Sequence, residues 1–132
     1  MVGLFGRSKS PAEKKIIQRK KELRKLVKQK QYEKAIKVGN EILEKNPHEQ
    51  DVLFIVGGIY YMKNKLKTSI SYFDRSLEIA QFDTELLLLK ANAHFRLGDF
   101  SQAKQACQKI QEIDSKNKEV NELLEKIENS TK

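Results

Sequence analysis

The residue types that most often perform covalent or metal chemistry are scarce in this 132-residue chain. His48 and His94 are the two histidines, and Cys107 is the one cysteine. A nucleophilic site needs a thiol or hydroxyl beside a base, and a transition-metal site needs several closely spaced nitrogen, sulfur or oxygen ligands. The two histidines fall in different parts of the sequence, and Cys107 has no second cysteine. We therefore expect no enzymatic activity, no bound metal and no cofactor.

Each of these residues also has a simpler structural interpretation. His94 falls where equivalent stretches of the sequence carry Leu26 and Tyr60, which predicts a partly buried packing residue. Cys107 is equivalent in the same way to Phe73, which predicts a small core residue rather than a reactive thiol. His48 follows Pro47 at an expected helix start and is predicted to be solvated. The numerous Asp and Glu residues alternate with Lys at helical spacing, as on a solvated helix face.

The composition indicates a helical protein with one core. Hydrophobic residues make up 39% of the chain and charged residues 33%, while Gly and Pro number only 6 and 2. A β-sandwich would need more turn residues. No apolar stretch approaches the eighteen residues of a membrane span. A single cysteine excludes an internal disulfide framework and fits a reducing compartment, so we expect a cytoplasmic location.

The positive charge is concentrated at the start of the sequence. Residues 1–30 contain eight Lys and three Arg against Glu13 and Glu22, a net charge of +9, and residues 31–132 have a net charge of −1. Such a segment can contact nucleic acid, an anionic lipid surface or an acidic protein. The Lys and Arg positions from 14 to 30 are spread around the expected helix, and no aromatic residues for base stacking are interleaved with them.

An internal repeat organises most of the chain. Similar stretches begin at Tyr32, Leu66 and Phe100, each 34 residues after the one before, with no insertion. A small residue follows three positions later in each. Upstream of each start lies a second amphipathic helical pattern, so every unit contains two helices joined by a short polar turn.

This pattern resembles the tetratricopeptide repeat, a 34-residue helix–turn–helix unit. The second unit matches best, and the third departs at Lys90. The first unit is degenerate in its first helix, where Arg19 and Glu22 stand at positions that are usually apolar. The matching residues of the second unit are Leu53, Val56, Gly57, Tyr60, Leu66, Ser69, Phe73, Ser76 and Leu77; those of the third are Leu87, Ala91, Gly98, Phe100 and Ala103; those of the first are Tyr32, Ala35, Ile36, Leu43 and Pro47.

The resemblance implies an all-α fold, a right-handed α-solenoid of three units with a capping helix. We expect helices at about 11–29, 32–45, 48–63, 66–80, 84–97, 100–114 and 117–128. The units span about 16–49, 50–83 and 84–117 within residues 11–116, between a flexible tail at 1–10 and a C-terminal tail at 129–132. Ser10-Pro11-Ala12-Glu13 predicts a capping box, and Asn46-Pro47-His48-Glu49 is interpreted in the same way. Tyr60 and Phe73 are expected to fill the space between units.

The resemblance also implies a concave wall formed by the first helix of each unit, and this wall is unusually apolar. We call its apolar part the strip, and we predict that it binds a partner. A basic rim on the first unit is expected to favour acidic flanks in that partner. The strip consists of Phe54, Ile55, Gly58, Tyr61, Met62, Leu88, Leu89, Asn92 and Phe95; the rim consists of Lys20, Lys21, Arg24 and Lys28. The alternative is that some strip residues belong to the core.

One binding mode of the family is not expected. Co-chaperone members hold a C-terminal carboxylate with Lys, Asn and Arg side chains at five positions. The equivalent positions here are Lys20, Arg24, Ile55, Glu85 and Leu89. Only Lys20 agrees with the family pattern, and Glu85 would repel a carboxylate.

The favoured interpretation is a non-enzymatic scaffold or adaptor that binds a protein or peptide with apolar anchors and acidic flanks. The amphipathic partner segment would lie in the groove. A homo-oligomer is a further possibility, either through the groove or through the segment containing Val2, Leu4 and Phe5. The alternative function is binding of nucleic acid or an anionic surface through the basic N-terminal helix; nucleic acid is not the expected partner.

Overall fold

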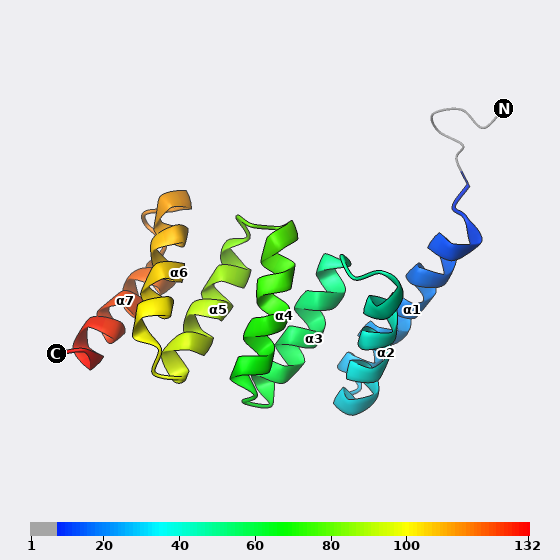
Figure 1. Cartoon of the computed structure of the whole chain (residues 1–132), viewed down its shortest axis with the longest axis horizontal. Coiled ribbons are helices and arrows are strands. Elements are labelled where there is room, and N and C mark those ends of the chain that lie inside the picture. Colours follow the sequence, from blue (N-terminus) through cyan, green and yellow to red (C-terminus); the bar gives the residue numbers. More distant parts are fainter. Residues whose placement is uncertain (1–7) are drawn as a thin grey trace. The chain divides into compact units, whose positions relative to one another are not determined.

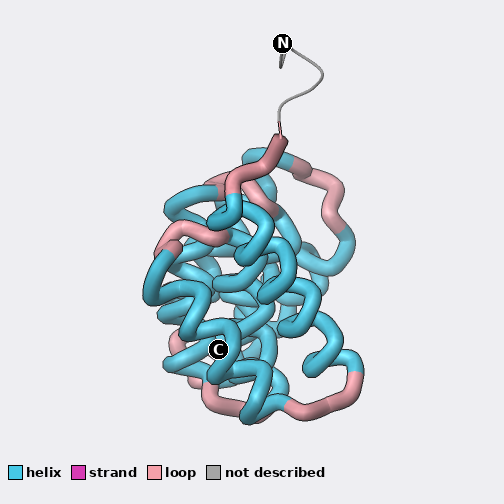
Figure 2. Tube along the Cα trace, turned by 90° about the vertical axis from the view of Figure 1, so that its right-hand side faces the viewer, coloured by secondary structure: helices cyan, strands magenta, loops and turns pink. Residues whose placement is uncertain are grey.

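The computed structural model describes residues 8–132. The predictions about Val2, Leu4 and Phe5 lie outside the described residues. Residues 8–132 contain helices and loops and no strand, as Figure 2 shows. In chain order the helices are α1 (Pro11–Lys28), α2 (Tyr32–Lys45), α3 (Gln50–Met62), α4 (Leu66–Ile79), α5 (Thr84–Arg96), α6 (Phe100–Ile113) and α7 (Lys118–Ser130).

The chain divides into two compact units, Met1–Pro47 and His48–Lys132. From here on, "unit" means one of these two parts, and "repeat" means one of the three 34-residue sequence repeats. The first unit holds the hairpin of α1 and α2. The second holds the hairpins α3–α4 and α5–α6, with α7 packed on α6. Within the second unit each helix packs against the next one along the chain (Figure 1). This is the all-α helical-repeat architecture that the sequence predicts.

Local signals in the sequence explain most helix starts. Ser10 Oγ accepts a hydrogen bond from the Glu13 amide at 3.1 Å, and the Glu13 carboxylate accepts one from the Ser10 amide at 3.3 Å. This is the predicted capping box. Asp99 Oδ1 caps α6 through the Gln102 amide. Asp83 and Asn117 cap α5 and α7 in the same way.

Two expected boundaries are wrong. Asn46 does not begin a helix but ends α2 as its C-terminal cap, and α3 begins at Gln50 after Glu49. Asn, Pro and Glu are the residue types of a helix start, but the linker after α2 is two residues longer than expected, and α3 begins at Gln50 instead of residue 48. At the other end, α7 continues to Ser130, so half of the expected C-terminal tail is helical.

The core of the α3–α4 hairpin is built around Phe73, which is fully buried. A Cβ atom placed on Gly57 of α3 would lie 2.8 Å from two atoms of the Phe73 ring. The glycine therefore makes room for the ring between the two helices. Phe73 thus fills space inside its own hairpin.

A second core cluster joins α5, α6 and α7. It contains Leu87 and Ala91 from α5, Cys107 and Ile110 from α6, and Leu123 from α7, all buried. The apolar face of α7 covers the last hairpin, which would otherwise leave these side chains in water. No helix within residues 8–132 is long and apolar enough to cross a membrane.

Candidate functional site

All nine strip residues lie in the second unit, on α3 and α5. Met62 is the most exposed of them, with 59% of its surface accessible. The other eight are half-buried. The strip is therefore neither a set of free side chains nor a part of the closed core.

The α3 part of the strip leans on the core of its own hairpin. The rings of Phe54 and Tyr61 each lie 6.4 Å from the Phe73 ring, centroid to centroid, in tilted arrangements. These two residues are two helical turns apart and flank the ring at the position where Gly57 leaves space. One side of each ring stabilises the hairpin, and the other side remains accessible.

The α5 part is arranged in the same way. Leu88 and Phe95 pack against the core cluster of α5, α6 and α7. The Phe95 ring lies 5.6 Å from the ring of Phe100 at the start of α6. The Asn92 side chain donates a hydrogen bond to the Leu88 carbonyl at 3.0 Å, so its amide is turned toward its own helix.

A polar bridge connects the C-terminal ends of α3 and α5. The Arg96 guanidinium lies 5.0 Å from the centre of the Tyr61 ring, a cation–π contact. The same group donates a hydrogen bond to Asn64 Oδ1 at 2.5 Å. Tyr61 also packs against a buried cluster formed by Ala93 of α5 with Leu66 and Ile70 of α4. This bridge holds an exposed positive charge at the end of the strip, where the two helices meet.

The strip analysis of the sequence did not single out this bridge. One signal could have revealed it: residues about 34 positions apart occupy equivalent places in adjacent repeats. Arg96 follows Tyr61 and Asn64 by nearly that interval, so stacking of the repeats brings the three side chains together.

The four rim residues lie on α1, in the first unit. Lys21, Arg24 and Lys28 are exposed, and Lys20 is half-buried. We therefore describe these residues with the first unit and not with the strip.

Four surface cavities lie away from the strip, and none of them is lined by a strip residue. One of about 370 Å³ opens over α4, α5 and α6. Lys90 and Asp74 form an ion pair of 2.7 Å in its wall. Lys90, which departs from the repeat pattern, is thus used to link α5 to α4.

The cysteine and the two histidines that were considered for chemistry do not form a common site. Cys107 is fully buried, and this burial raises the pKa of its thiol to about 11. His48 is exposed, whereas His94 is nearly buried, with Nδ1 3.4 Å from a carboxylate oxygen of Asp99. Within residues 8–132, no three His, Cys, Asp or Glu side chains are grouped so that they could hold a metal ion.

Comparison with known proteins identifies the fold. Residues 84–132 match the family described as the Fis1 C-terminal tetratricopeptide repeat. No curated protein sequence matches the chain.

Several solved structures of tetratricopeptide-repeat proteins superpose on nearly the whole chain. The first repeat domain of Spaghetti (RPAP3), bound to the HSP90 peptide SRMEEVD, is 20% identical, with a TM-score of 0.79 over 89% of this chain and 94% of that one. The Yersinia enterocolitica chaperone SycD, in complex with a peptide of the translocator YopD, is 14% identical, with a TM-score of 0.80 over 90% and 96%. Yeast Tom70 is 22% identical, with a TM-score of 0.81 over 89% of this chain and 24% of its own.

Proposed function

Because the chain has the fold of tetratricopeptide-repeat proteins, we propose that it is a non-enzymatic interaction module that binds a peptide segment on the strip of α3 and α5. The observation that carries this proposal is the combination of half-buried apolar side chains with one fixed cation, Arg96, within a single compact unit. Structures of the same fold have been solved with bound peptides, for Spaghetti and for SycD. These complexes support a peptide as the type of ligand.

The apolar residues of the strip supply the anchoring surface. Ile55, Met62 and Leu89 keep accessible area on the two helices, and the accessible edges of Phe54 and Tyr61 lie beside them. Their inner sides are held by the hairpin core. A surface that is already ordered loses little conformational entropy when a ligand binds. Aliphatic or aromatic side chains of an amphipathic segment would be the matching anchors.

Arg96 gives this surface a preference for acidic ligands. A guanidinium carries five N–H donors, and the contact with Asn64 uses one of them. Stacking on Tyr61 restricts the side chain to one orientation, which favours recognition of a planar carboxylate. We therefore propose that the ligand carries an Asp or Glu side chain next to its apolar anchors.

A terminal-carboxylate clamp is not part of the proposal. At the positions of the clamp, this chain has Ile55, Glu85 and Leu89 in the second unit, and Glu85 is exposed. We expect the peptide SRMEEVD to bind this chain weakly. A second copy of this chain is the competing occupant of the strip. The single buried cysteine supports a reducing location, for which we propose the cytoplasm.

The experiment selects peptides from a random library on the full chain and measures their dissociation constants with variants. Met62→Glu with Leu89→Glu places two charges on the strip and should weaken binding at least tenfold. The control is Ser71→Glu with Gln108→Glu, which adds the same charge at exposed positions of α4 and α6. Phe54 is not used, because its loss would also disturb Phe73.

A second variant tests the role of Arg96. Hydrogen bonds to charged groups contribute about 1.5–3 kcal/mol, so Arg96→Gln should weaken acidic peptides about tenfold or more. The same peptide with its acid replaced by Ala should lose little further affinity in that variant. Equal weakening by the strip variant and its control would refute the proposed site. A dimer in sedimentation that the strip variant dissociates would show that a second copy occupies the strip.

A further inference from the structure

Helix α1 presents a row of four lysines to solvent. Lys14, Lys21, Lys25 and Lys28 are all exposed, whereas Leu23 is fully buried. At about 100° per residue, the four lysines fall within a sector of roughly 60°, on the side opposite Leu23. The basic residues spread around the helix when the sequence alone is considered, but these four exposed lysines share one face of it.

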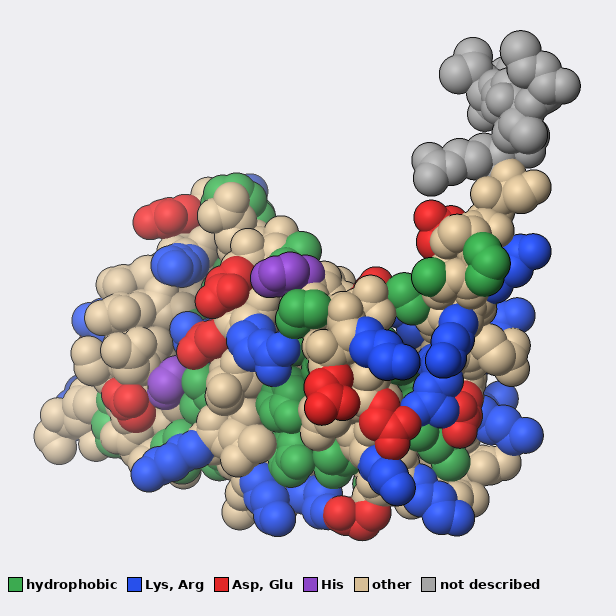
Figure 3. Space-filling view, turned by 45° about the vertical axis from the view of Figure 1, so that its right-hand side comes forward, with side chains coloured by type: hydrophobic (Ala, Val, Ile, Leu, Met, Phe, Trp, Pro, Cys, Tyr) green, Lys and Arg blue, Asp and Glu red, His purple; other side chains and the backbone are tan. Residues whose placement is uncertain are grey.

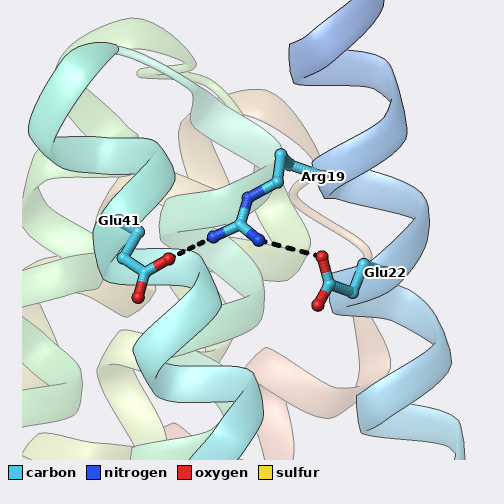
Figure 4. A network of polar contacts seen from close by, with 3 residues as sticks. All are labelled: Arg19, Glu22 and Glu41. Atoms are coloured by element: carbon cyan, nitrogen blue, oxygen red, sulfur yellow. Dashed lines mark hydrogen bonds and ion pairs between the residues drawn. The ribbon is translucent and has the colours of Figure 1, made fainter.

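The other basic residues of α1 are partly committed elsewhere. Arg19 is half-buried and forms ion pairs with Glu22 of α1 and Glu41 of α2 (Figure 4). Lys20 is also half-buried, whereas Lys15 and Arg24 are exposed at the sides of the row. The row of four lysines extends about 21 Å along the helix axis at 1.5 Å per residue. Lys and Arg side chains gather on the surface of this part of the molecule, below the grey atoms in Figure 3.

We propose that this row binds the surface of an anionic lipid membrane. A straight row on one side of a helix touches a plane along its whole length, so all four ammonium groups reach the headgroups together. Lysine acts as a compact point charge and suits mobile headgroups that offer no fixed geometry. Lysine clusters on amphipathic helices are attracted to the negative surface of cytoplasmic leaflets.

The flanks of the row favour a plane over a nucleic-acid groove. Glu13 and Glu22 project about 90–100° to either side of the row. A helix lying in a groove would bring both carboxylates near phosphates, but a helix lying on a plane keeps them away from the surface. Helix α1 contains no aromatic residue that could stack on a base.

The proposal concerns the first unit alone and does not depend on peptide binding by the second. The test measures co-sedimentation of the full chain with phosphatidylcholine vesicles that contain phosphatidylserine, and with pure phosphatidylcholine vesicles. A mixed-sequence DNA duplex is the competing probe. Binding should require phosphatidylserine and weaken steeply with salt.

The decisive variant replaces the four row lysines with glutamine. Each lysine near an anionic surface contributes about fivefold, so the loss of four should weaken binding about six hundredfold. Its control replaces four lysines of the second unit with glutamine and so removes the same net charge. These exposed lysines are Lys67, Lys104, Lys109 and Lys126. A Lys→Arg version of the row should bind as the wild type does, and thermal melts show that each variant is folded.

Two outcomes support the proposal together: selective loss in the row variant, and little loss in the control. Equal loss in both variants would show that net charge alone is responsible and would overturn it. Tighter binding to the DNA duplex than to the anionic vesicles would also overturn it, as would failure to bind the vesicles at low salt.

Discussion

The hairpins α1–α2 and α3–α4 occupy the same 34-residue frame but distribute side-chain volume in opposite ways. In the second repeat, Gly57 of α3 faces the large ring of Phe73 in α4. The equivalent positions in the first repeat are Leu23 in α1 and Gly39 in α2, and both are buried. The third repeat has a pair of small residues there, Ala91 and Cys107.

In each repeat at least one residue of the pair is Gly or Ala, and this small residue stands on either helix: Gly57 in α3, Gly39 in α2 and Ala91 in α5. Substitutions that conserve volume in a core cost little, whereas an unmatched change leaves a cavity or forces overlap. This explains why α1 departs from the repeat pattern in sequence and still packs as the first helix of a repeat.

The two hairpins also differ in the side-chain contacts that join their helices. Arg19 of α1 reaches Glu41 of α2 on a partly exposed surface. The second hairpin has aromatic contacts instead: Phe54 and Tyr61 with Phe73, and a stacked pair of Tyr60 and Tyr72 at 5.6 Å. Exposed ion pairs contribute about 0–1 kcal/mol, much less than buried aromatic rings.

The largest expected effect on stability comes from removing the Phe73 ring from the core of the second hairpin. Phe73→Ala removes a fully buried ring from between α3 and α4 and should lower the free energy of unfolding by about 3–5 kcal/mol. Urea denaturation measures this change. Cys107→Ala, at the equivalent position of the third repeat, should cost clearly less. A similar cost for both would contradict the role of the Phe73 ring in filling the space between α3 and α4.

Filling the same space from the other side should have a smaller effect. Gly57→Ala places a Cβ atom 2.8 Å from Phe73, whose ring is held by its neighbours, and should cost about 1–3 kcal/mol. Gly58→Ala is the matched control, because no atom lies within 4 Å of its added Cβ. The control should gain up to about 1 kcal/mol from helix propensity. If the two variants melt at the same temperature, the close approach at Gly57 is not a constraint.

The capping box of α1 offers an effect of intermediate size in the first unit. Ser10→Ala removes the oxygen that accepts from the Glu13 amide and should cost about 0.5–2 kcal/mol. Faster amide hydrogen exchange in the first turn of α1, without a change in α5, would confirm that the effect is local. Ser10→Asn retains a capping oxygen and should restore the wild-type rates.

The smallest expected effect is that of the ion pair between Arg19 and Glu41 in the first hairpin. Arg19→Leu loses the contact to Glu41 but places an apolar side chain where the repeat pattern expects one, so stability should change by less than about 1 kcal/mol. A double-mutant cycle with Glu41→Gln measures the coupling directly. A coupling of several kcal/mol would show that the ion pair, rather than Leu23, holds the hairpin together.

Sequence reasoning predicted what depends on neighbours along the chain. The 34-residue spacing predicts the order and extent of the helices, and Ser10 with Glu13 predicts a capping box that the structure contains. Asn46 shows the limit, since its residue type suits either end of a helix and only the path of the linker decides. Contacts between helices, such as Arg19 with Glu41 or Gly57 with Phe73, depend on the rotation of each helix in its hairpin.

For the candidate site, helical spacing was sufficient to place the nine strip residues on two helices, but not to show how deeply each is buried. Phe54 and Tyr61 are partly covered because each packs against the Phe73 ring, which occupies the space that Gly57 leaves open. The contact of the Arg96 cation with Tyr61 was not predicted, since it arises from the packing of one repeat on the next.

The most direct test of peptide binding by the strip is the set of backbone amide resonances that shift when a selected peptide is titrated into the labelled chain. The account predicts that the largest shifts occur on the exposed side of α3 and α5, around Ile55, Met62, Leu89 and Arg96. Shifts confined to α4 and α6, where the 370 Å³ cavity opens, would contradict it.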